Sequence, residues 1–143
     1  MAGSITSFTG VHAFLSNFHR CKVVFDGAVY PSAEHAYQAA KTQVNSDREK
    51  IRLAGTPALA KRFGRLVHCR KGWDEMKISV MRRIIREKFK SGDLRARLLA
   101  TGDAALVEGN WWGDTFWGVC QCRGENHLGK LLMEIRAEAK ACG

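Results

Sequence analysis

The sequence lacks the features that mark membrane-spanning, exported and disordered proteins. It has no uninterrupted apolar run approaching the roughly 18 residues that identify a membrane helix. No basic segment followed by an apolar run lies near its first residue, so we expect no signal peptide. Only two of its 143 residues are proline and 45% are hydrophobic, which excludes a disordered or low-complexity chain. The length predicts one compact domain, residues 1–143, with no membrane partner.

Cysteine is present, but its pattern argues against a full set of disulfide bonds and against a metal site. Five cysteines cannot all pair within one chain, and Cys120 and Cys122 are too close for an ordinary disulfide. The sequence has no Cys-x-x-Cys and no pair of histidines at ligand spacing, so we expect no metal. We also expect no cofactor. Reduced thiols and a cytoplasmic location are the prediction.

Positive charge is in clear excess. The chain has 23 Lys and Arg against 14 Asp and Glu, a formal net charge of +9. This excess favours a polyanionic or phosphorylated partner, although a basic protein whose charge serves only solubility remains the alternative. One basic run is consistent either with DNA binding or with the solvated face of a core helix. It consists of Arg82, Arg83, Arg86, Lys88, Lys90, Arg95 and Arg97.

The first regular structure predicted is a β-hairpin from Cys21 to Tyr30. Strand-forming residues lie on both sides of Asp26-Gly27, a strong signal for a two-residue turn. A lone hairpin is marginally stable in water, so it must pack on helices or join further strands. Its second strand leads directly into a helix that begins at Ser32, the expected N-cap.

Capping residues predict the helices that follow. Ser46 and Glu49 form a capping-box pattern for one helix, and Thr56-Pro57 begins another that Gly64 closes. An apolar stripe at helical spacing predicts a central core helix from about residue 73 to 89. The remaining predictions are a helix at 94–100, a short strand at 105–107, a structured loop at 108–129 and a last helix at 126–139. The predicted fold class is therefore α+β and mainly helical, with a small hairpin packed on a helical core.

The helix from Ser32 to Lys41 is the first candidate site. Glu34, Gln38 and Lys41 are spaced i, i+4 and i+7, which places them on one face, with Tyr37 beside them. A carboxylate in the first turn, followed by an amide and an ammonium, is typical of an active-site wall. It is equally typical of an ordinary solvated face, and this stretch alone does not decide between them.

The second candidate site is the loop at 108–129, which holds three of the four tryptophans, five glycines and three carboxylates. Aromatic walls beside Asp114 suit a planar base or a sugar ring, whereas the alternative is a lid with tryptophan plugs. Enzymes that cleave glycosidic bonds use two such groups, and Glu34 with Asp114 is a candidate pair. Phe14 to Phe18 is interpreted as a loop with buried rings and polar tips, or as a plain turn.

Five motifs in order carry a resemblance to a known family. They are Phe14-Leu-Ser-Asn-Phe18, Tyr30-Pro-Ser-Ala-Glu-His-Ala-Tyr-Gln-Ala-Ala-Lys41, Gly72-Trp73, Asp114-Thr-Phe-Trp-Gly118 and Gly124-Glu-Asn-His-Leu-Gly-Lys-Leu-Leu-Met-Glu-Ile-Arg136. The sequence resembles the NADAR / YbiA-like family over about residues 14–136. The resemblance implies a compact, mainly helical α+β domain with N-glycosidase activity. Characterised members cleave ribosylamine intermediates of riboflavin synthesis or remove ADP-ribose from guanine in DNA.

The resemblance also implies roles for individual residues. Glu34 falls on the family's key glutamate, and Asp114 and Trp117 fall on its Asp-x-aromatic-Trp-Gly motif, so Glu34 and Asp114 are the expected catalytic residues. Expected substrate-binding residues are Asn17, Tyr37, Gln38, Lys41, Trp73, Trp117, Gly118 and Asn126. The chain departs from the family at Cys120, where glycine is frequent.

The chemistry expected of these groups is hydrolysis of a C1′–N bond. Glu34 would stabilise an oxocarbenium-like ribosyl centre and deprotonate the incoming water, while Asp114 would orient that water, bind ribose hydroxyls or protonate the leaving nitrogen. Lys41 would bind a 5′-phosphate. The expected partners are a phosphorylated ribosyl or ADP-ribosyl substrate and DNA that carries ADP-ribose. The alternatives are a non-catalytic ADP-ribose or nucleotide-binding module and a simple nucleic-acid-binding protein.

Overall fold

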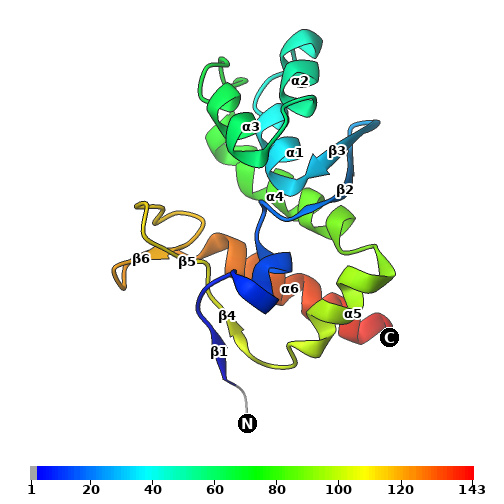
Figure 1. Ribbon diagram of the computed structural model, residues 1–143, viewed down its shortest axis with the longest axis vertical. Helices are drawn as coiled ribbons and strands as arrows, with labels where there is room; N and C mark the ends of the chain where they lie inside the picture. Colours follow the sequence, from blue (N-terminus) through cyan, green and yellow to red (C-terminus); the bar gives the residue numbers. More distant parts are fainter. Residues whose placement is uncertain (1–2) are drawn as a thin grey trace. The chain divides into compact units, whose positions relative to one another are not determined.

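The computed structural model describes residues 3–143, and its contacts form two compact units (Figure 1). One unit is continuous and comprises residues 17–88. The other combines residues 3–16 with residues 89–143. In residues 3–143 no helix is both long and apolar enough to cross a membrane. The prediction of a single domain over the whole chain stays a prediction.

The continuous unit opens with the predicted hairpin. Strands β2 (Arg20–Phe25) and β3 (Ala28–Ser32) pair antiparallel, with Val23 opposite Tyr30. Asp26 (φ 46°) and Gly27 (φ 80°) both have positive φ, as a two-residue turn of this type requires. The Ser32 hydroxyl then accepts a hydrogen bond from the His35 N–H, so the predicted N-cap is confirmed.

Four helices follow in this unit: α1 (Ala33–Ala40), α2 (Asn45–Arg52), α3 (Pro57–Gly64) and α4 (Trp73–Lys88). Thr56 caps α3 through the Leu59 N–H, as predicted. The capping box at Ser46 and Glu49 was wrong, because α2 already begins at Asn45 and Val44 holds the N-cap position. Glu49 instead binds Arg52 at the end of the same helix.

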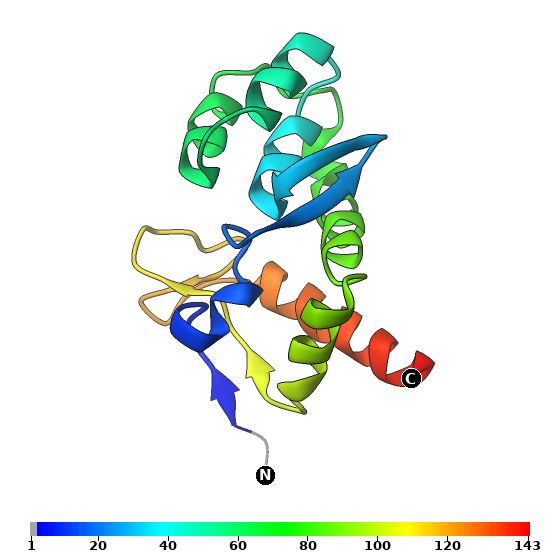
Figure 2. The same cartoon turned by 45° about the vertical axis from the view of Figure 1, so that its right-hand side comes forward.

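Helix α1 is the centre of the unit. It contacts both hairpin strands and also α2, α3 and α4, and Figure 2 shows the hairpin lying along α1 and α4. All eight residues of α1 are buried. The interpretation of its Glu34–Gln38 side as a solvated face was therefore wrong. Alanine at four of the eight positions leaves room for neighbouring elements on every side.

Lys88 departs from the prediction of a solvated basic face. It lies on the apolar stripe of α4 and is fully buried. Burial lowers the pKa of its ammonium to about 8, although the neighbouring Cys21 thiol acts in the opposite direction. The basic run of the sequence is therefore not one uniform surface.

The tip of the hairpin is tied to two helices through Asp26. Its carboxylate binds Arg48 of α2 at 3.0 Å and Arg83 of α4 at 3.1 Å, and both guanidinium groups lie over the Phe25 ring. Partial burial on its own would raise the pKa of the Asp26 carboxyl. The hydrogen bonds from the two arginines outweigh burial and hold this pKa below its ordinary value.

Asp26→Asn is expected to lower the free energy of unfolding at neutral pH by less than about 1 kcal/mol, because these ion pairs are partly exposed. Asn tolerates the positive φ at this position, so the change isolates the charge. Since the pKa is lower in the folded state, the carboxylate stabilises the fold fully above the unfolded value of about 4. That contribution is lost as the pH falls through the lower folded value. Urea unfolding of both proteins from pH 7 downward measures the difference, and a difference that does not shrink in acid contradicts this account.

The discontinuous unit is built on one long helix and several short elements. The elements are β1 (Ser4–Ile5), the 3-10 helix η1 (Gly10–Leu15), α5 (Gly92–Ala100), β4 (Ala105–Leu106), β5 (Gly109–Asn110), β6 (Val119–Cys120) and α6 (His127–Cys142). Strands β1 and β4 pair in parallel, as do β5 and β6. The sequence predicted α5, β4 and α6 to within a few residues. It did not predict the two-residue strand β1 or the 3-10 helix η1, and it assigned the segment of β5 and β6 to a loop.

Helix α6 and strand β4 approach each other closely at Gly129. A Cβ atom there would lie 2.1 Å from the Leu106 carbonyl oxygen, so only glycine fits. Leu128, Leu131 and Leu132 are buried on the same helix. This contact sets the position of the chain just before the tryptophan-rich loop.

Candidate active site

Glu34 lies in the first turn of α1, and only 8% of it is exposed. Its backbone N–H donates to the Asn17 carbonyl at 3.0 Å. The Gln38 amide, one turn later, donates from Nε2 to Glu34 Oε2 at 2.6 Å. The i, i+4 spacing predicted this neighbourhood correctly. A buried carboxylate held by one short hydrogen bond is suited to act on a ligand rather than to solubilise the chain.

Two buried amide oxygens beside Glu34 have no hydrogen-bond partner within the described chain, residues 3–143. They are Asn17 Oδ1 and Gln38 Oε1. Among residues 3–143, the Asn17 Nδ2 atom makes one long contact, of 3.6 Å to the Met81 sulfur. Unpaired buried acceptors are uncommon and each requires a reason.

Lys41 ends α1 on the same side as Glu34. Burial lowers the pKa of its ammonium, and the nearby Cys69 thiol and Glu34 carboxylate only partly offset this. Arg65 and Lys61 act in the same direction as burial, because they are also positive. Lys41, Lys61 and Arg65 are close enough to interact, and together they make a site that attracts an anion.

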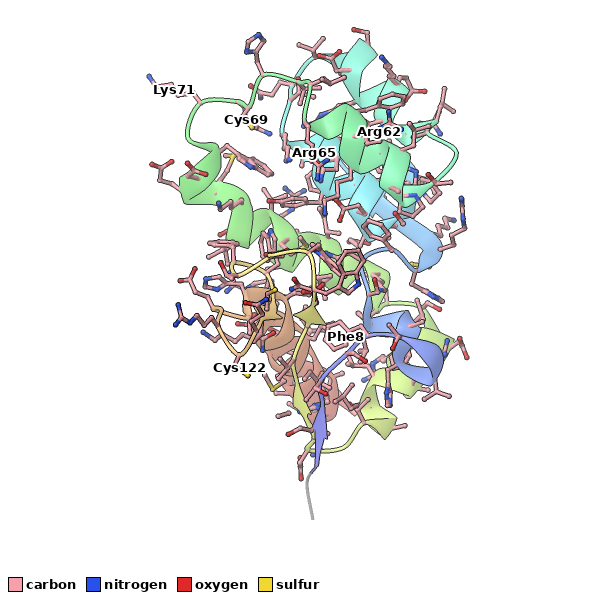
Figure 3. All side chains as sticks on the ribbon, turned by 60° about the vertical axis from the view of Figure 1, so that its left-hand side comes forward. Phe8, Arg62, Arg65, Cys69, Lys71 and Cys122 are labelled. Atoms are coloured by element: carbon pink, nitrogen blue, oxygen red, sulfur yellow. The ribbon has the colours of Figure 1, made fainter. Side chains whose placement is uncertain are left out.

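The positive charge of the chain is concentrated in the unit of residues 17–88. That unit holds 16 of the 23 Lys and Arg residues and seven of the 14 acidic residues, so it carries the whole net charge of +9. Residues 50–73 contain seven Lys and Arg and no acidic residue. Figure 3 labels Arg62 on α3, Arg65 at the C-cap of this helix, and Cys69 and Lys71 in the loop that follows it.

Tyr37 and Trp73 form an aromatic pair beside these charges. Their ring centroids are 5.4 Å apart and both residues are 7% exposed. The Lys41 ammonium lies 5.7 Å from the Tyr37 ring centre. The pair is well packed, and its small exposed portion offers a flat apolar edge.

Asp114, in the discontinuous unit, binds backbone N–H groups of its own loop. Its Oδ1 atom accepts hydrogen bonds from the N–H groups of Phe116 at 3.1 Å and Trp117 at 2.9 Å. Its own N–H donates to Asn110 Oδ1, and the Asn110 amide donates back to the Asp114 carbonyl. This carboxylate therefore stabilises a turn that sets the position of Trp117.

Gly118 is required by the same loop. A Cβ atom at this position would lie 1.8 Å from Glu108 Oε2 and 2.2 Å from the Glu108 carbonyl oxygen. The Asn110 amide also donates to Glu108 Oε2 at 3.1 Å. Sequence reasoning missed both Asn110 and Glu108, because neither belongs to a periodic pattern. The sequence feature that could have pointed to them is the high number of glycines in this loop.

Asn126 joins the start of α6 to the chain before the loop. It is left-handed (φ 54°), its Oδ1 accepts from the Glu108 N–H and its Nδ2 donates to the Leu106 carbonyl, each at 3.0 Å. Both ends of this amide are thus occupied within the protein. These two hydrogen bonds explain why asparagine is at position 126, even without a contact to substrate.

The aromatic side chains of the loop are not all plugs. Trp111 is 87% exposed and Trp112 is 50% exposed, so for these two the plug interpretation was wrong. Trp117 packs on Phe116, with ring centroids 4.8 Å apart. Phe18, whose ring was expected to be buried, is 42% exposed.

The predicted site residues therefore fall into two sets, one in each unit. The continuous unit brings together Asn17, Glu34, Tyr37, Gln38, Lys41 and Trp73. The discontinuous unit holds Asp114, Trp117, Gly118 and Asn126. In residues 3–143 no group of three or more His, Cys, Asp or Glu side chains is placed to hold a metal ion.

Comparison with known proteins identifies the family. The NADAR domain matches residues 7–140. The chain belongs to the NADAR family. The N-glycosidase YbiA of Escherichia coli is 42% identical over 130 residues, which cover 86% of this chain and 79% of that protein. The NMR structure of E. coli YbiA matches with a TM-score of 0.86 and 38% identity, covering 99% of this chain and 88% of that one.

A second kind of relative carries the fold inside a longer protein. A riboflavin biosynthesis protein of Vibrio vulnificus is 40% identical over 131 residues, which cover 89% of this chain but 35% of that protein. The expected α+β, mainly helical, YbiA-like fold is confirmed by the structural match. The NADAR chain described here is an enzyme of the N-glycosidase type.

Proposed function

We propose that this NADAR protein hydrolyses the C1′–N bond of a phosphorylated ribosyl or ADP-ribosyl N-glycoside, with Glu34 as the central catalytic group. The observation that carries the proposal is the Glu34 carboxylate, buried at the start of α1 and held by Gln38 Nε2 at 2.6 Å. A carboxylate fixed in this way stabilises positive charge that develops on a ribosyl centre. Burial strengthens that interaction, because little water screens it.

The reaction balances with water as the only co-reactant. The C1′–N bond breaks and its electron pair leaves with the nitrogen, which gains a proton. Water supplies the new C1′–O bond while Glu34 accepts its proton, as a general base does in glycoside hydrolysis. Glu34 then returns that proton to solvent, which balances the proton that the nitrogen gains. The products are a free ribosyl sugar and the base or amine.

Substrate binding is proposed for the groups around Glu34. Lys41, with Lys61 and Arg65 nearby, binds a phosphate group of the substrate. Asn17 Oδ1, a buried acceptor with no partner among residues 3–143, accepts a hydrogen bond from a ribose hydroxyl. The exposed edge of the Tyr37–Trp73 pair contacts the sugar or the base.

The residues of the loop have proposed roles of their own. The roles that the resemblance implies for Trp117, Gly118 and Asn126 stay predictions for the discontinuous unit: an aromatic face for a planar base on Trp117, and the shape of its loop at Gly118 and Asn126. Asp114 holds Trp117 through its N–H, and the resemblance also predicts a direct role for Asp114 at the reacting bond.

Two substrate classes remain in the proposal, and different observations favour each. Relatives named for riboflavin biosynthesis favour a small phosphorylated ribosylamine. The net charge of +9, carried by residues 17–88, favours ADP-ribosylated guanine in DNA, whose backbone is a polyanion. A non-catalytic ADP-ribose-binding module is the alternative if no bond is cleaved.

A product screen by mass spectrometry tests the function. Purified protein is incubated with a phosphorylated ribosylamine of riboflavin synthesis, with free nucleotides and with DNA that contains ADP-ribosylated guanine. Release of a free base or amine together with the ribosyl product from one class supports the proposal and names the substrate. Tight binding with no release from any class establishes the binding module instead.

A further inference from the structure

Gly64 is the last residue of α3, and its backbone does not require glycine. The helix continues smoothly into its C-cap, Arg65, which has helical dihedral angles (φ −72°, ψ −19°). Gly64 is therefore not the left-handed residue that usually makes glycine favourable at a helix end. Alanine is a better helix former than glycine. The sequence thus holds a poor helix former at a buried position, and the reason must lie in its surroundings.

The three atoms nearest to a side chain at position 64 all belong to Gln38. A Cβ atom at position 64 would lie 1.9 Å from Gln38 Oε1, 2.7 Å from its Cδ and 2.9 Å from its Cβ. Oε1 is one of the two buried oxygens with no hydrogen-bond partner within residues 3–143. Gln38 Oε1 lies against the backbone of Gly64, where a weak contact with the Cα–H group is the most it can make.

The same amide binds the candidate catalytic carboxylate through its other atom. Gln38 Nε2 donates to Glu34 Oε2 at 2.6 Å, and Gln38 is only 3% exposed. The amide therefore has a fixed orientation: its oxygen lies against α3 and its nitrogen points to Glu34. A side chain at position 64 would occupy the space of that oxygen and displace the amide.

We propose that Gly64 is a positioning residue for the reaction, because its missing side chain makes the space that orients Gln38 toward Glu34. Gly64 itself touches neither the carboxylate nor a substrate. Through Gln38 it makes helix α3 part of the machinery that fixes Glu34. The catalytic meaning of this contact rests on the proposed role of Glu34, whereas the contact itself does not.

Gly64→Ala tests the proposal with two separate measurements. The first is the side-chain amide of Gln38 in ¹⁵N NMR spectra, which is assigned by its loss in Gln38→Ala and is simple to find among three glutamines. In the wild type this amide is expected to be protected from solvent exchange, and in Gly64→Ala the protection is expected to fall at least about tenfold. The second is turnover: kcat is expected to fall about tenfold or more, with a smaller change in KM.

Controls separate positioning from simple misfolding. Gly55→Ala adds the same methyl group just before α3, where nothing lies within 4 Å, and is expected to leave both readouts unchanged. Gln38→Gly removes all three crowding atoms, so adding Gly64→Ala to it should lower kcat by less than about twofold further. An equal loss from Gly64→Ala in both backgrounds overturns the proposal.

Two further results are decisive. If Gly64→Ala does not fold, the wild type still tests the contact: a nuclear Overhauser effect between the Gly64 Hα and the Gln38 side chain supports it, and its absence overturns it. A protein that cleaves none of the N-glycosides but shows the amide result retains the contact and loses the proposed function. An amide that stays protected in Gly64→Ala overturns the positioning role, whatever the turnover.

Discussion

Glu34→Gln is expected to lower kcat by at least about a thousandfold while substrate affinity changes by less than about tenfold, roughly 1.4 kcal/mol. Glutamine has the size of glutamate, and its oxygen can still accept the hydrogen bond that Gln38 Nε2 now donates to Glu34. The change therefore removes charge and basicity and little else. Without a negative charge, positive charge at the ribosyl centre is no longer stabilised and water is no longer deprotonated.

The measurement pairs single-turnover kinetics with calorimetric binding of the same substrate. Glu49→Gln is the matched control, because Glu49 lies in the same unit and pairs with Arg52 at its surface. It should retain full turnover. A Glu34→Gln protein that keeps its turnover removes Glu34 from the reaction, and one that loses binding as well as turnover makes Glu34 a ligand for the substrate instead.

The fold could be predicted from the sequence wherever local chemistry decides it. The Asp26-Gly27 turn and the Thr56 cap each depend on two or three adjacent residues, and both formed as expected. Strand β1 was missed because it has two residues and pairs with β4, which is distant in the sequence. Helix η1 was missed although its hydrogen bonds are local. The capping box failed at Ser46 because the helix begins two residues earlier, with Val44 at the N-cap position.

The candidate site was predicted in part by spacing and in part by resemblance. Spacing placed Glu34 beside Gln38, and the structure confirmed that contact. It could not decide whether the face was buried, because burial of α1 depends on three other helices and a hairpin. It also could not show that Gly64 sets the place of the Gln38 amide, since that contact joins residues 26 positions apart. Long-range packing of this kind leaves no periodic trace in one sequence.

Two variants of Asp114 are expected to distinguish a role in holding the loop from a role at the reacting bond. Asp114→Ala removes both the charge and the hydrogen bonds of the side chain, and Asp114→Asn removes the charge alone. Asp114→Ala deletes the acceptor of the Phe116 and Trp117 N–H groups. The lost hydrogen bonds correspond to about 2–3 kcal/mol, so kcat/KM is expected to fall roughly a hundredfold. Asp114→Asn keeps an oxygen that accepts both bonds and removes only the charge. It should remain within about tenfold of the wild type if Asp114 acts by holding the loop.

The comparison of the two variants decides between positioning and catalysis. An Asp114→Asn protein as inactive as Asp114→Ala shows that the carboxylate itself acts at the reacting bond, as the resemblance predicts. Asp103→Asn is the matched control, because Asp103 lies in the same unit and pairs with Lys140 at the surface. Trp117 fluorescence cannot be isolated among four tryptophans, so loop order is followed through the Trp117 backbone N–H in NMR spectra. That N–H should stay protected in Asp114→Asn and lose its protection in Asp114→Ala, since the hydrogen bond to Oδ1 survives only in the first.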